Sequence, residues 1–185
     1  MTKVILVCSG QTDWDSNGRI QGLLDIPLNA EGYREAKEAA EELSDMRMDA
    51  IYSGSLSRTY QTARIIAQPH KLKVKKLTAF DDINYGIWQG ILLKEIKKKH
   101  RKSYNLWRSK PLYAKPPKGE AVKDVQQRVI AHTEKLLARH RRQIFCLVSH
   151  PVINIIIKCH FLKQNLDKIW EMLPEAGSWE VLEGK

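Results

Sequence analysis

The chain has 185 residues, a formal net charge of +10 and 43% hydrophobic residues, values typical of one soluble globular domain over residues 1–185. Its apolar runs are far shorter than the ~20 residues that span a bilayer, and no basic segment with a long apolar run begins the chain, so we expect neither a membrane partner nor a signal peptide. Three cysteines without metal-motif spacing, Cys8, Cys146 and Cys159, favour free thiols in the cytoplasm.

In the first half of the chain, apolar runs and turn residues predict strands that alternate with helices. Four consecutive apolar residues before Cys8 are typical of a strand that is buried on both faces. Asn29 is a good N-cap, and Pro69 is expected to end a helix. The predicted elements are a strand at 4–8, a polar loop at 11–29, a helix at 29–43, a strand at 49–52, a helix from 56–58 to before Pro69, and a strand at 73–77.

The second half continues the alternation. The apolar run that ends at Val148 predicts another buried strand, and Pro151 suits the first turn of the helix that follows it. The predicted elements are a loop at 81–90, a helix at 92–102, an extended stretch at 111–117, a helix at 121–140, a strand at 144–148, a helix at 152–162, and a strand at 179–182. Together they predict an α/β fold, a three-layer sandwich with a mostly parallel sheet.

The positive charge is concentrated in residues 94–118. This segment holds ten of the 31 Lys and Arg residues but one of the 21 Asp and Glu residues, so the rest of the chain is nearly neutral. Such a segment suits nucleic acid, an acidic protein or an anionic ligand. It is also typical of a helix and loop that only face solvent. Its aromatic residues, Tyr104, Trp107 and Tyr113, lack the regular spacing of a single-strand-binding groove.

Polar residues follow two of the predicted buried strands. Ser9 comes after the first strand and His150 after the strand at 144–148. Ligand sites in parallel sheets lie at the carboxyl ends of the strands. Arg58 begins a helix, and a helix N-terminus favours negative charge. These residues alone indicate a pocket for phosphate or carboxylate.

The order of motifs resembles the histidine phosphatase superfamily, which has the phosphoglycerate mutase-like fold. The likeness covers nearly the whole chain. The family's opening Arg-His-Gly-(Glu/Gln)-Thr corresponds to Cys8-Ser9-Gly10-Gln11-Thr12. The further matches are Trp14-Asp15 with Gly18-Arg19-Ile20-Gln21-Gly22 and Asp25-Ile26-Pro27-Leu28-Asn29, Leu56-Ser57-Arg58 with Thr62-Ala63, residues 82–90, Pro117-Lys118-Gly119-Glu120, and Val148-Ser149-His150.

The resemblance implies a role for each matched position. In the family, a histidine attacks phosphorus, two arginines and a second histidine bind the phosphoryl oxygens, and a Glu acts as acid or base. The corresponding positions are Ser9 for the nucleophile, Cys8 for the first arginine, Arg58 for the second, His150 for the second histidine, Asp82 for the acid, and Asn17 and Arg19 at the pocket mouth. Pro151 stands where the family usually has Gly. Because Ser9 has no ring nitrogen, no phosphohistidine can form there.

The leading hypothesis is therefore a phosphoglycerate mutase-like protein without phosphohistidine chemistry. It keeps a pocket for a small phosphorylated or carboxylate ligand, and it needs no cofactor or metal. One alternative is a phosphomonoester phosphatase with a changed nucleophile, either Cys8 or Ser9 with His150 as base. Another alternative is a zinc site formed by Cys8, His150 and Asp82. In a last alternative, the basic segment is the functional surface, for nucleic acid or an acidic partner.

Overall fold

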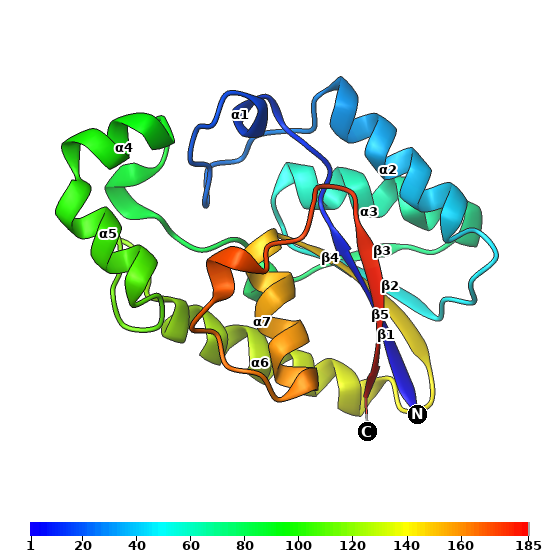
Figure 1. Ribbon diagram of the computed structural model, residues 1–185. Coiled ribbons are helices and arrows are strands. Elements are labelled where there is room, and N and C mark those ends of the chain that lie inside the picture. The colour runs from blue at the N-terminus through cyan, green and yellow to red at the C-terminus, as the bar shows by residue number, and fades with distance from the viewer. Residues whose placement is uncertain (185) are drawn as a thin grey trace.

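The computed structural model describes residues 1–184 (Figure 1). It contains a five-stranded sheet in the order β3-β2-β4-β1-β5. The strands are β1 (Thr2–Cys8), β2 (Ala50–Ser53), β3 (Val74–Lys76), β4 (Ile144–Ser149) and β5 (Trp179–Gly184). The first four are parallel, and β5 pairs with β1 in the antiparallel direction. The predicted α/β fold with a mostly parallel sheet is confirmed.

Helices cover both faces of this sheet. They are α1 (Asp13–Ser16), α2 (Ala30–Glu42), α3 (Ser57–His70), α4 (Leu93–Lys99), α5 (Arg101–Ser109), α6 (Val122–Arg139) and α7 (Pro151–Leu162). Short 3₁₀ turns lie at Thr78–Phe80, Gly86–Trp88 and Ile169–Glu171. None of the helices within residues 1–184 combines the length and the apolar character that crossing a membrane requires.

The alternation of side chains along β1 divides the core into two layers. Ile5 and Val7 pack in the cluster formed with α2 and α3. Val4 and Leu6 pack in the opposite cluster, with α6 and α7. The central strands therefore have no exposed face, which explains why they read as unbroken apolar runs. Polar side chains follow these strands at their carboxyl ends, where the apolar runs stop.

Three predicted elements differ from the observed ones. The helix expected to stop before Pro69 runs on to His70, so Pro69 lies inside the last turn and the helix ends one residue after it. The basic helix expected at 92–102 is two helices that meet at His100. The loop expected at 11–29 contains α1, which Thr12 caps through hydrogen bonds exchanged with Asp15.

Candidate functional site

A cavity of about 360 Å³ lies at the carboxyl ends of β1 and β4. Ser9 follows β1 and His150 follows β4, and both line the cavity. The ladder between the two strands fixes their relative position, because Cys8 pairs with Ser149 and the Ser9 N–H donates to the Ser149 carbonyl at 2.9 Å. The structure therefore brings together the two strand ends that the sequence marked.

The loop after β1 lies close against the start of α2. A Cβ added to Gly10 would come within 2.4 Å of the Gly32 carbonyl oxygen, so no side chain fits there. The Gly10 N–H donates to the Thr62 hydroxyl at 3.1 Å, which ties the loop to α3. Both contacts hold Ser9 at the cavity wall, where it is 6% exposed.

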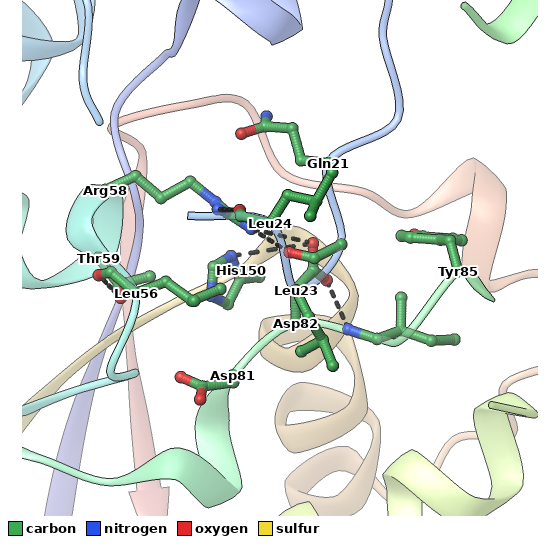
Figure 2. Close-up of polar contacts among 12 residues, drawn as sticks. Gln21, Leu23, Leu24, Leu56, Arg58, Thr59, Asp81, Asp82, Tyr85 and His150 are labelled. Carbon is green, nitrogen blue, oxygen red and sulfur yellow. Dashed lines mark hydrogen bonds and ion pairs between the residues drawn. The ribbon is translucent and has the colours of Figure 1, made fainter. Parts of the chain in front are cut away.

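Arg58 reaches the cavity from the first turn of α3 and is buried. Its guanidinium donates to the carbonyls of Gly22 at 2.7 Å and Leu24 at 2.9 Å. The Nη2 atom also lies 3.5 Å from Asp82 Oδ2. Figure 2 shows Arg58, Asp82 and His150 turned toward one another beside the backbone of residues 22–24. A buried cation thus faces a buried carboxyl and an imidazole.

Burial dominates the protonation of this group. It raises the pKa of Asp82 to about 6, although the Arg58 cation opposes the rise. Burial, together with the nearby charges of Arg58 and Arg128, holds the pKa of His150 well below its usual value. His150 is therefore neutral at pH 7. Its Nδ1 lies 3.9 Å from Asp82 Oδ2, and its buried Nε2 has no hydrogen-bond partner within residues 1–184.

Cys8 lines the same cavity but is 1% exposed. Burial raises the pKa of its thiol far above the usual value, and the charges of Asp15 and Asp82 add to the rise. A thiol attacks phosphorus as the thiolate. The cavity therefore keeps Cys8 in its unreactive form, which weighs against the alternative in which Cys8 is the nucleophile.

The two residues expected at the mouth are placed differently. Arg19 lines the cavity, donates to the Gly90 carbonyl, and has its guanidinium carbon 5.5 Å from the centroid of the Trp14 ring. Asn17 is not among the lining residues, and its amide donates to the Asp13 carbonyl at 2.6 Å. Its place is taken by Asp15, an exposed carboxylate that sequence reasoning did not select.

A signal for Asp15 is present in the sequence. It stands in the Trp14-Asp15 pair, where the resembled family has Trp-Asn. The carboxylate accepts hydrogen bonds from the Thr12 hydroxyl at 2.8 Å and from the Gln21 amide at 2.6 Å. These bonds fix it at the cavity rim. The cavity wall therefore contains two guanidinium groups and two carboxyl groups.

The zinc alternative requires Cys8, His150 and Asp82 to converge as ligands. Within residues 1–184, no three His, Cys, Asp or Glu side chains form a group that could hold a metal ion. A larger hollow of about 780 Å³ opens beside α3 and β3, but it contains none of the residues that the sequence singled out. The cavity at the ends of β1 and β4 is the candidate site.

Comparisons with known proteins match this chain over nearly its whole length. The family model described as histidine phosphatase superfamily (branch 1) matches residues 4–185. Phosphoserine phosphatase 1 of Hydrogenobacter thermophilus is 36% identical over 182 residues, which cover 98% of this chain and 86% of that protein. The structure of Bacillus stearothermophilus YhfR covers 100% of this chain and 92% of its own, with a TM-score of 0.92 and 26% identity. A mycobacterial glucosyl-3-phosphoglycerate phosphatase in complex with VO3 has a TM-score of 0.90 and 27% identity, and the match covers 98% of this chain and 92% of that one.

Proposed function

Since this chain belongs to the histidine phosphatase superfamily (branch 1), we propose that it binds a small phosphorylated or carboxylate ligand in the cavity without forming a phosphohistidine. The proposal is supported by Ser9 in the opening motif, which the resemblance aligns with the family's nucleophilic histidine. A serine hydroxyl lacks the ring nitrogen that forms a phosphohistidine.

Two of the three groups that the resemblance assigns to binding the phosphoryl oxygens are retained. Arg58 supplies a buried positive charge at the cavity, and His150 lines the same cavity with an Nε2 atom that has no hydrogen-bond partner within residues 1–184. Charge-assisted hydrogen bonds to an anion are strong when they are shielded from water. These two residues support binding.

The third group is altered, and a carboxylate has been added. Cys8 is a neutral thiol where the family has an arginine, and Asp15 adds a negative charge at the rim. Two guanidinium groups therefore face two carboxyl groups, so the cavity has little net positive charge with which to stabilise the charge that develops in phosphoryl transfer. These changes support a binding role over catalysis.

A second candidate function is phosphomonoester hydrolysis with Ser9 as nucleophile. The observation that favours it is the neutral imidazole of His150, whose Nε2 has no partner within residues 1–184 and is free to accept a proton, although its lowered pKa makes it a weak base. It requires the Ser9 hydroxyl to donate to that atom, a hydrogen bond that is absent within the described residues. A Ser9→Ala variant separates the two functions, because it abolishes hydrolysis by Ser9 and leaves ligand binding largely intact.

The decisive experiment compares the native chain with a Ser9→His, Cys8→Arg double variant. The panel contains p-nitrophenyl phosphate, phosphoserine and 3-phosphoglycerate, and calorimetry measures the binding of inorganic phosphate. Phosphoserine is included because a relative is named phosphoserine phosphatase. We expect the native chain to bind phosphate without hydrolysing any of the three substrates. We expect the double variant to gain phosphatase activity. Turnover by the native chain that Ser9→Ala abolishes would overturn the proposal.

The anion site needs its own control. Arg58→Lys keeps the charge but loses the forked contacts, so we expect it to weaken phosphate binding about tenfold. Arg64→Ala lies on the same helix with an exposed side chain and should leave binding unchanged. If Arg58→Lys binds phosphate as the native chain does, Arg58 is not the anion-binding group.

A further inference from the structure

Ten of the 31 basic residues of the chain lie on one arm beside the sheet. We use "basic arm" for residues 93–118, which comprise α4, α5 and the segment that leads to α6. Figure 1 shows α4 and α5 on the side of the molecule opposite α2 and β3. All ten Lys and Arg side chains of the arm are exposed: Lys94, Lys97, Lys98, Lys99, Arg101, Lys102, Arg108, Lys110, Lys115 and Lys118.

These charges have few partners within residues 1–184, although Lys97 Nζ and the Arg108 guanidinium carbon each lie 5.7 Å from a ring centroid, of Tyr104 and Trp170 respectively. Of the ten, Lys99 alone forms an ion pair within residues 1–184, with Glu95 at 3.3 Å. Elsewhere the chain pairs its surface charges more often, as in Arg34 with Glu31 and Glu38 on α2. Because like charges at this density repel one another, an arm of this composition is stabilised by a polyanion that neutralises it.

The arm is held rigidly on an aromatic base. Trp107 packs against Trp170, with ring centroids 3.9 Å apart, and against Trp88 at 5.7 Å. Ile96 of α4 is fully buried in the same core. Both helices are therefore anchored on their inner faces, and their cations project from a fixed surface. Binding loses less conformational entropy on such a surface than on a flexible tail.

The spacing of the cations suits a chain of phosphates. Lys94, Lys97 and Lys98 stand three and four residues apart, so they share one exposed face of α4 with about 5–6 Å between neighbouring Cβ atoms. Arg101 and Lys102 continue the track at the start of α5. A nucleic-acid backbone presents dense, repeating negative charge along such a track.

We propose that the basic arm is a nucleic-acid-binding surface that contacts the phosphate backbone. An anionic membrane fits less well, because a membrane-binding helix needs apolar side chains between its cations, and the exposed face of α4 carries lysines. An acidic protein fits less well, because carboxylates spaced among other side chains cannot match unpaired cations spread over two helices and the segment after them. The proposal does not depend on the ligand of the cavity.

Fluorescence anisotropy with a fluorescein-labelled 20-base single strand and a 20-base-pair duplex tests the proposal. About five phosphate contacts predict a salt slope near −4.5, so raising KCl from 50 to 200 mM should weaken binding roughly 500-fold. The test variant is Lys94→Glu, Lys97→Glu, Lys98→Glu. We expect it to bind at least tenfold more weakly at 100 mM, with a salt slope smaller by about 2.7.

The matched control is Lys37→Glu, Lys71→Glu, Lys73→Glu. It changes the net charge by the same amount, but its exposed lysines lie on α2 and before β3, away from the arm. We expect less than threefold weakening. Circular dichroism and urea unfolding confirm that both variants are folded. Equal weakening by both variants, no binding to either nucleic acid at 50 mM KCl, or tighter binding to poly-glutamate or phosphatidylserine vesicles would overturn the proposal.

Discussion

Replacing Arg58 with Ala removes the cation that faces Asp82 inside the cavity. At any pH, the variant loses the hydrogen bonds to the carbonyls of Gly22 and Leu24, which are 2.7 and 2.9 Å long. At pH 8 it also leaves a buried carboxylate without its partner, because the pKa of Asp82 in the native chain is about 6. At pH 5 the carboxyl is protonated, so this second loss does not occur.

The two contributions set the expected free energies of unfolding. Removing one partner of a buried ion pair costs about 3–5 kcal/mol, so we expect the variant to lose about 4 kcal/mol at pH 8. At pH 5 the lost hydrogen bonds remain and cost about 2–3 kcal/mol. Linkage gives the sign of the difference between the two pH values. Loss of Arg58 raises the pKa of Asp82 in the folded state further. Each pKa unit of that rise lowers the free energy of unfolding by about 1.4 kcal/mol at pH values above the folded-state pKa.

Urea unfolding followed by tryptophan fluorescence at pH 5 and pH 8 measures both values. The native chain is measured at each pH, so other titrating groups cancel. The control is Arg64→Ala, an exposed position on the same helix, where we expect a change below about 0.5 kcal/mol. A cost that is equal at the two pH values, or larger at pH 5, would refute the coupling between Arg58 and Asp82.

Three further predictions concern the same cavity and its surroundings. Sulfate remains a dianion from pH 5 to 8, so its own charge does not change over this range. Its affinity for the cavity should rise about tenfold as the pH falls through the Asp82 pKa of about 6, because the negative charge of Asp82 is neutralised. Calorimetry should find this pH dependence lost in Asp82→Asn. In the folded chain the three thiols are at most 2% exposed, those of Cys8, Cys146 and Cys159. A thiol reagent should therefore label them at less than about a tenth of the rate seen in urea. Rapid labelling of Cys8 in the folded chain would contradict its burial. Gly86→Ala places a Cβ 2.1 Å from the Pro117 carbonyl oxygen, whereas a Cβ at Gly18, which also has a positive φ, would have nothing within 4 Å. In urea unfolding, Gly86→Ala should lower the free energy of unfolding by about 2 kcal/mol more than Gly18→Ala does. Equal losses would argue against the contact.

The parts of the fold that the sequence predicted are those set by local patterns. Short stretches of sequence are enough to recognise the apolar runs of β1 and β4 and the helical spacing of apolar residues in α6. The break at His100 lies in a basic stretch that reads as one helix. Packing of Trp107 against Trp88 and Trp170, which are distant in the chain, accompanies this break and has no local signal.

The candidate site shows the same division. Family motifs select Ser9, Arg58 and His150, and strand ends explain why they meet. Which groups are charged could not be predicted, because the pKa of Asp82 depends on burial that only the assembled cavity provides. Asn17 was chosen from the resemblance, whereas Asp15 lines the cavity, since α1 turns Asp15 toward the wall and leaves Asn17 outside it.

The position of β1 in the sheet has a consequence for how the protein is made. β1 is made before the other four strands of the sheet, yet both strands that pair with it, β4 and β5, lie after residue 143. The N–H of Cys8 also has no hydrogen-bond acceptor until Ser178 has been made, because it donates to the Ser178 carbonyl at 2.8 Å. A nascent chain halted in α6 therefore has no cavity, and its apolar β1 is free to pair with other chains. Both edges of β1 stay open until β4 and β5 have been made.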